Sequence, residues 1–369
     1  MTTRARSLTA LSEPEQRRVR LTEAFTAVKI DALIVSSAAN IRYLSGFTGS
    51  NGLLLVAPGA AVLFTDPRYT TQAAQETDCT VRIVHGPLHP ALLQAAARRR
   101  LRRLGFEPAG LTWQAWNRIN EGLPLNTSLY PAPPLAESMR RIKSASEVEA
   151  IRRSVITNSK AFERASRKIA PGITEAALAA AIEHQMRLLG AEKPAFDTIV
   201  ASGPHTALPH AVPRDVAVRP KQLVLVDMGC FQAAYASDMT RMAFTGTPPP
   251  RVRRLYKAVL EAQLAACDAV RAGVQAGTVD RAARRVLRGY GYERLFIHST
   301  GHGLGLEIHE PPRIGRRDPS VLQAGMVITI EPGAYIEGYG GIRIEDTILV
   351  TETGCEILTP TSKDLLTVP

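Results

Sequence analysis

Two histidines stand close together in the stretch GHGLGLEIHEPP, residues 301–312. His302 lies between two glycines, and His309 follows it in the same stretch, directly before a glutamate. A histidine flanked by glycines can cap a turn, or it can bind a metal, because glycine lets the backbone come close to a ligand. The stretch alone leaves both interpretations open, and the acids elsewhere in the chain decide between them.

Four acids stand in or beside apolar runs that are typical of β-strands. Asp227 ends the run LVLVD and Glu331 ends VITIE, while Asp238 and Glu345 follow them at a short distance along the chain. We expect each pair on two successive strands joined by a short connection, about 4.8 Å apart, so that both carboxylates face one point. Unpaired buried acids are rare, which makes a purely structural role the weaker interpretation for the first two. The other two could instead mark strand ends.

An internal repeat accounts for the presence of two such pairs. Each copy contains a glycine, a threonine and an amphipathic helix, then a strand–glycine–histidine segment, then two acid-bearing strands. The corresponding segments are residues 168–190 and 273–291, 196–213 and 296–312, and 222–244 and 325–350. Three correspondences in the same order predict a duplicated α+β unit.

The pseudo-symmetry of such a unit would bring both acid pairs to one place. Buried carboxylates repel one another and lose their water, so they persist only where cations neutralise them. Four carboxylates and one imidazole suit divalent manganese, cobalt, iron or zinc, and bridging carboxylates suit two ions about 3.5–4 Å apart. Manganese is the expected metal, although the ligand types do not select it. We therefore expect two divalent metal ions as cofactors. The expected ligands are Asp227, Asp238, His302, Glu331 and Glu345.

The motifs VDMG, SDMTR, TGHGLGLEIHEPP, TIEPGAY and GIRIED resemble, in this order, those of the pita-bread metallopeptidases. Within that family, the proline-directed aminopeptidase P and prolidase are the most similar, and residues 40–52 and 64–73 resemble their creatinase-type leading domain. The resemblance implies an α+β protein with a smaller α/β creatinase-like domain over residues 1–140 and a pita-bread catalytic domain over residues 141–369. It also implies an Xaa-Pro aminopeptidase, with an Xaa-Pro dipeptidase (prolidase) as the alternative.

The resemblance assigns a role to each expected ligand. Asp238 and Glu345 would bridge both ions, and Asp227 would bind one of them. His302 and Glu331 would bind the other. Glu331 is also expected to take a proton from the attacking water and pass it to the leaving nitrogen. Creatinase lacks the complete set, so the presence of all five disfavours a creatine hydrolase.

Three further residues are expected to act on the substrate or on the charge of the site. His210 in LPHAVP and His309 in IHEPP resemble the family's two substrate-facing histidines and occupy equivalent positions in the repeat. A histidine of this kind is expected to help stabilise the oxyanion. Arg343 precedes Glu345 by two residues, hence on the same strand face, where it would offset carboxylate charge or orient a ligand.

Turn residues and helix caps predict the elements around the repeat. Residues 31–37, 52–58 and 60–66 are predicted strands, the last two joined in a hairpin at Pro58-Gly59. Residues 89–105 are a predicted helix that ends at Gly105.

The boundary between the two domains is predicted near residue 140. The segment before it has three prolines within residues 131–134, which favours an extended backbone. Ser144 and Glu147 then form a capping box that begins a long helix.

Composition limits the other function classes. The apolar runs over residues 52–58 and 60–64 are too short to span a bilayer, so no membrane partner is expected. Residues 1–18 show no signal-peptide pattern, and four scattered cysteines fit a reducing compartment, so we expect a cytoplasmic protein.

The formal net charge of +11 raises the possibility of nucleic-acid binding. The arginine clusters have helical spacing and no nucleic-acid motif accompanies them, which disfavours that role. The complete ligand set also disfavours a non-catalytic peptide-binding relative. The expected partner is a peptide with proline at its second position, and the expected assembly is a homodimer.

Overall fold

The computed structural model describes residues 11–368, which form two compact units that meet in sequence between Arg140 and Arg141. The segment in which no signal peptide was predicted lies mostly outside the described residues. Within residues 11–368, no helix combines the length and the apolar character that crossing a membrane would require.

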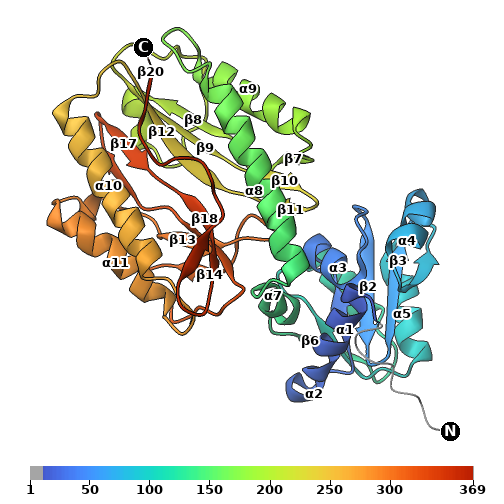
Figure 1. Ribbon diagram of the computed structural model, residues 1–369. Helices are drawn as coiled ribbons and strands as arrows, with labels where there is room; N and C mark the ends of the chain where they lie inside the picture. Colours follow the sequence, from blue (N-terminus) through green and yellow to red (C-terminus); the bar gives the residue numbers. More distant parts are fainter. Residues whose placement is uncertain (1–10, 369) are drawn as a thin grey trace. The chain divides into compact units, whose positions relative to one another are not determined.

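The first unit is built on one six-stranded sheet in the order β4-β3-β2-β1-β5-β6 (Figure 1). Its strands are β1 (Ala32–Val35), β2 (Gly52–Ala57), β3 (Ala60–Thr65), β4 (Thr80–Ile83), β5 (Arg103–Phe106) and β6 (Ser128–Pro131). Its helices are α1 (Glu13–Glu23), α2 (Phe25–Val28), α3 (Ala38–Ser45), η2 (Pro67–Tyr69), α4 (Thr70–Glu76), α5 (Leu88–Arg98), α6 (Trp113–Glu121) and α7 (Leu135–Arg140). Strand β2 is antiparallel to both of its neighbours, and the other pairs are parallel.

Two predictions in this unit have different outcomes. The hairpin at Pro58-Gly59 is confirmed, because β2 and β3 pair in antiparallel register up to Ala57 and Ala60. The helix predicted over residues 89–105 is wrong in its last part: α5 ends at Arg98, and residues 103–106 form β5. Arg100 adopts a left-handed conformation with φ of 54°, which stops the helix. Pairing with β1 and β6 on either side then outweighs the helical propensity of the arginine-rich run.

The second unit contains the predicted duplication. Its first half contains α8 (Ala145–Ser166), α9 (Glu175–Leu188), β7 (Lys193–Pro194), β8 (Ile199–Ser202), η3 (Gly203–Ala207), β9 (Leu223–Met228), β10 (Cys230–Gln232), β11 (Tyr235–Ala236) and β12 (Met239–Thr245). Its second half contains α10 (Pro250–Asp268), α11 (Ala276–Gly289), η4 (Glu293–Leu295), β13 (Gly301–Gly303), β14 (Glu310–Ile314), β15 (Val327–Ile330), β16 (Gly333–Ile336), β17 (Gly340–Arg343), β18 (Asp346–Val350) and β19 (Cys355–Ile357). A last strand, β20 (Leu366–Val368), pairs in parallel with β12 of the first half.

The strands of this unit lie between two pairs of helices, α8 with α9 and α10 with α11 (Figure 1). Strand β9 shows how the sequence produces this arrangement. Leu223 and Leu225 belong to the core cluster that includes α10 and α11, while Val224 and Val226 belong to the cluster that includes α8 and α9. Because both faces of the strand are covered, its sequence is continuously apolar rather than alternating.

The capping box predicted at the start of α8 is confirmed. The Ser144 side chain accepts a hydrogen bond from the backbone N–H of Glu147, and the Glu147 carboxylate accepts one from the backbone N–H of Ser144. Two of the backbone N–H groups that a helix start leaves without partners are thereby satisfied.

Candidate metal centre

The two acids of the first half lie at the same end of a strand pair. Asp227 belongs to β9, where it pairs with Thr240 of β12, and Asp238 directly precedes β12. The connection between the acids is more elaborate than predicted, because the small ribbon β10–β11 is inserted between them.

The second half repeats this arrangement. Ile330 of β15 pairs with Asp346 of β18, so Glu331 and Glu345 lie just beyond the same end of this strand pair. The ribbon β16–β17 occupies the place that β10–β11 has in the first half. In each half, the pairing register therefore brings two acids together despite the excursion between them.

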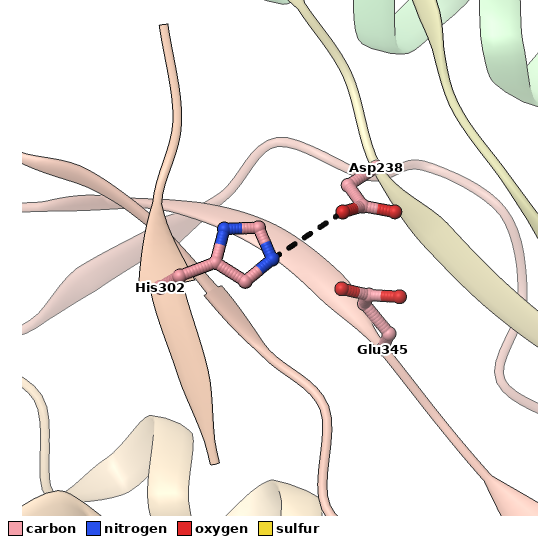
Figure 2. A group of neighbouring side chains, drawn as sticks. All are labelled: Asp238, His302 and Glu345. Carbon is pink, nitrogen blue, oxygen red and sulfur yellow. Dashed lines mark ion pairs between the residues drawn. The ribbon is translucent and has the colours of Figure 1, made fainter. Parts of the chain in front are cut away.

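The acids of the two halves meet at one point, beside His302 of β13. The ligand atoms of Asp238, His302 and Glu345 all lie within 4.8 Å of one another, and Figure 2 shows these three side chains turned toward a common centre. His302 Nε2 is 3.5 Å from Asp238 Oδ2 and 3.6 Å from Glu331 Oε1. Four of the five predicted ligands thus adjoin one another.

The fifth predicted ligand, Asp227, lines one cavity together with these four residues. Its oxygens show how well the cluster fits a cation. Asp227 Oδ1 and Asp238 Oδ1 are both buried and have no hydrogen-bond partner among the described residues. A buried carboxylate oxygen without a partner is costly, and a divalent cation would supply the missing interaction. The donor set of four carboxylates and one imidazole is therefore suited to divalent metal ions.

The pKa values of the clustered acids also indicate that the cluster needs a cation. Burial raises the pKa of Asp238 well above its ordinary value, and the charges of Asp227 and Glu331 raise it further. Burial and the Asp238 charge act in the same way on the pKa of Glu345, and burial also raises the pKa of Glu331. Without a cation, the cluster favours protonated carboxyl groups over carboxylates.

Arg343 supplies one positive charge to the cluster. Its Nη2 donates to Asp227 Oδ2 at 2.5 Å, and its Nε donates to Thr240 Oγ1 at 3.1 Å. Thr240 in turn donates to Glu345 Oε2 at 2.7 Å. Arg343 and Glu345 were predicted to share one face of a strand. However, β17 ends at Arg343, so Glu345 is not part of that strand. The ion pair is formed with the first half instead.

A cavity of about 1010 Å³ contains the cluster and the two histidines predicted to face a substrate. Both His210 and His309 are exposed in this cavity. The His309 ring stands edge-on to the His302 ring, with 4.3 Å between centroids. Although His309 is exposed to the cavity, the partial loss of water around its ring, together with the nearby His302 and His210, lowers its pKa, which favours its neutral form. All predicted site residues therefore line one cavity.

The cavity also contains His298, a residue that was not predicted from the sequence. Its Nε2 is 2.8 Å from the Tyr335 hydroxyl, and its Nδ1 is 2.8 Å from the carbonyl oxygen of Ser299. Burial and the Arg343 charge lower the pKa of His298 to about 4, so the ring is neutral at neutral pH. Arg343 Nη1 donates to the same hydroxyl at 2.8 Å, so Tyr335 connects the arginine to the histidine. The sequence feature that could have indicated His298 is its position four residues before His302, which makes it a third histidine in this region.

Comparison with known proteins gives matches over most of the chain. Residues 149–352 match the model of metallopeptidase family M24, and residues 17–142 match the creatinase/prolidase N-terminal domain. A curated Xaa-Pro dipeptidase from Pyrococcus furiosus is 36% identical over 95% of this chain and 100% of its own length.

Solved structures give the same result for the fold. An Xaa-Pro dipeptidase from Bacillus anthracis aligns with a TM-score of 0.94 and 34% identity, covering 96% of this chain and 100% of that one. An X-Pro aminopeptidase from Thermotoga maritima aligns with a TM-score of 0.88 and 37% identity, covering 94% and 100%. These matches identify the second unit as the pita-bread domain and the first as the creatinase-like domain.

Proposed function

We propose that this chain, which belongs to metallopeptidase family M24, is a dipeptidase that hydrolyses Xaa-Pro dipeptides with the help of two divalent metal ions. From the sequence, an Xaa-Pro aminopeptidase is the first expectation and an Xaa-Pro dipeptidase is the alternative. The relatives support the second of these better, because curated proteins and solved structures with full-length matches are named Xaa-Pro dipeptidase or prolidase. Manganese as the metal, the homodimer and the cytoplasmic location stay predictions.

The observation that carries the choice of substrate is the place of Arg313. It lies in β14 directly opposite His302 of β13, and its side chain lines the cavity. Among residues 11–368, no carboxylate forms an ion pair with its guanidinium. A dipeptide has a free carboxylate on the proline, one residue beyond the scissile bond. A longer peptide has an amide there, so a cation at this place favours the dipeptide.

The residues of the site would have three roles in hydrolysis: metal binding, proton transfer and stabilisation of the oxyanion. Asp227, Asp238, His302, Glu331 and Glu345 would hold the ions, which when bound lower the pKa of a water molecule and polarise the scissile carbonyl. Glu331 takes the proton as the water oxygen bonds to the carbonyl carbon, and it delivers that proton to the proline nitrogen as the C–N bond breaks. His309 or His210 donates a ring N–H to the carbonyl oxygen as it gains negative charge.

We expect the metal-loaded protein to cleave an Xaa-Pro dipeptide with a kcat/KM at least about tenfold higher than that for the Xaa-Pro-Xaa tripeptide, because only the dipeptide pairs its carboxylate with Arg313. The measurement compares both substrates after loading with manganese or cobalt, with a chelator-treated sample as control. Preferred cleavage of the tripeptide would favour the aminopeptidase. Activity on neither substrate, in protein shown to contain metal, would refute both.

Substitution of Arg313 by alanine tests the carboxylate contact itself. We expect KM for the dipeptide to rise about tenfold to a hundredfold, because a charge-assisted hydrogen bond is lost, while kcat/KM for the tripeptide changes little. Arg317→Ala is the matched control, because it removes an equal charge from an exposed position outside the cavity lining. An equal decrease in kcat/KM for both substrates would show that Arg313 does not bind the substrate carboxylate.

A further inference from the structure

One buried carboxylate joins the two ends of the loop that carries His210. Glu175, the first residue of α9, is fully buried. Its Oε1 accepts hydrogen bonds from the backbone N–H and the hydroxyl of Ser202, both at 2.8 Å. Its Oε2 accepts a hydrogen bond from the backbone N–H of Arg214 at 3.1 Å. The Arg214 guanidinium donates one further bond to each oxygen of Glu175, both at 3.0 Å. Because Ser202 precedes and Arg214 follows residues 203–213, this carboxylate closes the loop.

The loop forms part of the cavity wall and supplies no predicted metal ligand. Residues 209–213 all line the cavity. His210 is exposed and Val212 is 75% exposed, while Ala211 between them packs in the core of this unit, so apolar packing holds this part of the loop at Ala211 and not at its two neighbours. The bonds to Glu175 hold its ends, and Thr206 Oγ1 holds its middle by accepting from the backbone N–H of Gly341 at 2.8 Å.

The second half of the duplicated unit also has a buried carboxylate that binds the segment before a strand of the site. Asp280 of α11 is fully buried and accepts from Thr300 Oγ1 at 2.9 Å and from Arg284 Nε at 2.7 Å. The two remaining nitrogens of Arg284 donate to the backbone carbonyls of Phe296 and His298 at 2.7 and 2.6 Å. These bonds fix residues 296–300, which lead directly into the predicted ligand His302.

The two arrangements are alike in what they bind, although the acids stand at different positions of their helices. Glu175 is the first residue of α9 and Asp280 is the fifth residue of α11. Each acid accepts a hydrogen bond from the hydroxyl residue that stands before a glycine, in Ser202-Gly203 and Thr300-Gly301. Each acid is also paired with an arginine. Both carboxylates are fully buried, although Arg214 itself is 46% exposed. A buried carboxylate brings little stability compared with apolar packing, so its presence in each half favours a positioning task.

We propose that Glu175 and Asp280 are positioning residues with the same task in the two halves: each fixes a segment that carries residues of the site. Glu175 fixes the loop of residues 203–213, which faces the substrate. Asp280 fixes residues 296–302, which include a metal ligand. The two carboxylates therefore govern different properties of the site, the first substrate binding and the second metal binding. Only the kinetic part of this proposal rests on the proposed function.

The test compares Glu175→Gln with Asp280→Asn in the full-length, manganese-loaded protein. Glu175→Gln is expected to lower kcat/KM for the dipeptide about tenfold, with manganese affinity nearly unchanged. Asp280→Asn is expected to weaken manganese binding about tenfold to a hundredfold, as loss of support behind a metal ligand does. Glu183→Gln on α9 and the exposed Asp268→Asn on α10 are the matched controls.

Hydrogen exchange measures the same positioning without relying on any activity. Exchange is expected to become faster over residues 202–214 in Glu175→Gln and over residues 296–302 in Asp280→Asn, each without change in the other segment.

If the wild-type protein cleaves no Xaa-Pro substrate, the proposed function fails, while exchange and manganese titration still test the positioning. If a variant does not fold, Ser202→Ala or Thr300→Ala replaces it. Equal effects of both variants on both segments, or no effect in folded protein, would overturn the proposal.

Discussion

Glu331→Gln is expected to lower kcat for Xaa-Pro hydrolysis by about 10² to 10⁴-fold, the contribution that a positioned general base makes. The amide keeps the size of the side chain and one oxygen, but it cannot take a proton from the attacking water. Glu331 stands 3.6 Å from His302, and burial raises its pKa, so its oxygens are placed for both metal binding and proton transfer. The measurement is steady-state kinetics on protein whose metal content has been determined by elemental analysis.

Glu337→Gln serves as the matched control for this substitution. Glu337 is exposed and follows β16 in the same ribbon, so the control removes an equal charge close by in sequence without entering the cavity lining. A Glu331→Gln enzyme that binds both metals and keeps the wild-type kcat would refute the proton-transfer role.

Asp238→Asn is expected to abolish activity and yet stabilise the metal-free protein. Asp238 is buried beside other acids, so the metal-free protein near pH 8 must either keep a repelled carboxylate or take up a proton, and asparagine avoids both costs. We expect the free energy of unfolding of the metal-free variant to exceed that of the wild type by about 1–3 kcal/mol near pH 8. Thermal unfolding in the presence of a chelator measures this difference. The cavity-lining Asp197→Asn is the control, since Asp197 is exposed.

The pH dependence of the same measurement gives a second check. The pKa values of Asp238 and Glu345 are raised in the folded state, so the metal-free folded protein holds these protons more tightly than the unfolded chain. Their contribution to stability is complete below the ordinary carboxyl range and is lost as the pH rises through the raised pKa values. The loss should be smaller in Asp238→Asn. If the stability of the metal-free wild type and of metal-free Asp238→Asn depended on pH in the same way, carboxylate repulsion would not be the cause of the difference in stability.

The parts of the site that lie on regular repeats could be predicted from the sequence. Asp227 and Glu331 were recognisable because an acid at the end of a strand buried on both faces has no ordinary structural explanation. Their partners Asp238 and Glu345 followed from the duplication, which places equivalent residues around one centre. The inserted ribbons did not disturb this prediction, because strand register, and not the length of the connection, brings the acids together.

The parts that depend on contacts across the two halves could not be predicted. Arg343 pairs with Asp227, and nothing in the local sequence of β17 indicates a partner on β9. His298 gains its low pKa from burial, which a sequence pattern around one histidine does not reveal. Strand β5 was missed for the same reason, because its neighbours β1 and β6 decide its conformation.

The pairing of β20 with β12 has a consequence for the order in which the protein is made. The ribosome synthesises β12 long before it reaches residues 366–368, so the edge of β12 that accepts β20 has no partner while the whole second half emerges. Unpaired strand edges recruit other strands, which makes the nascent chain prone to aggregation during this interval. Chaperone binding to the emerging first half would protect that edge. Slow codons placed between β12 and β20 would prolong the exposure and lower the yield of folded protein.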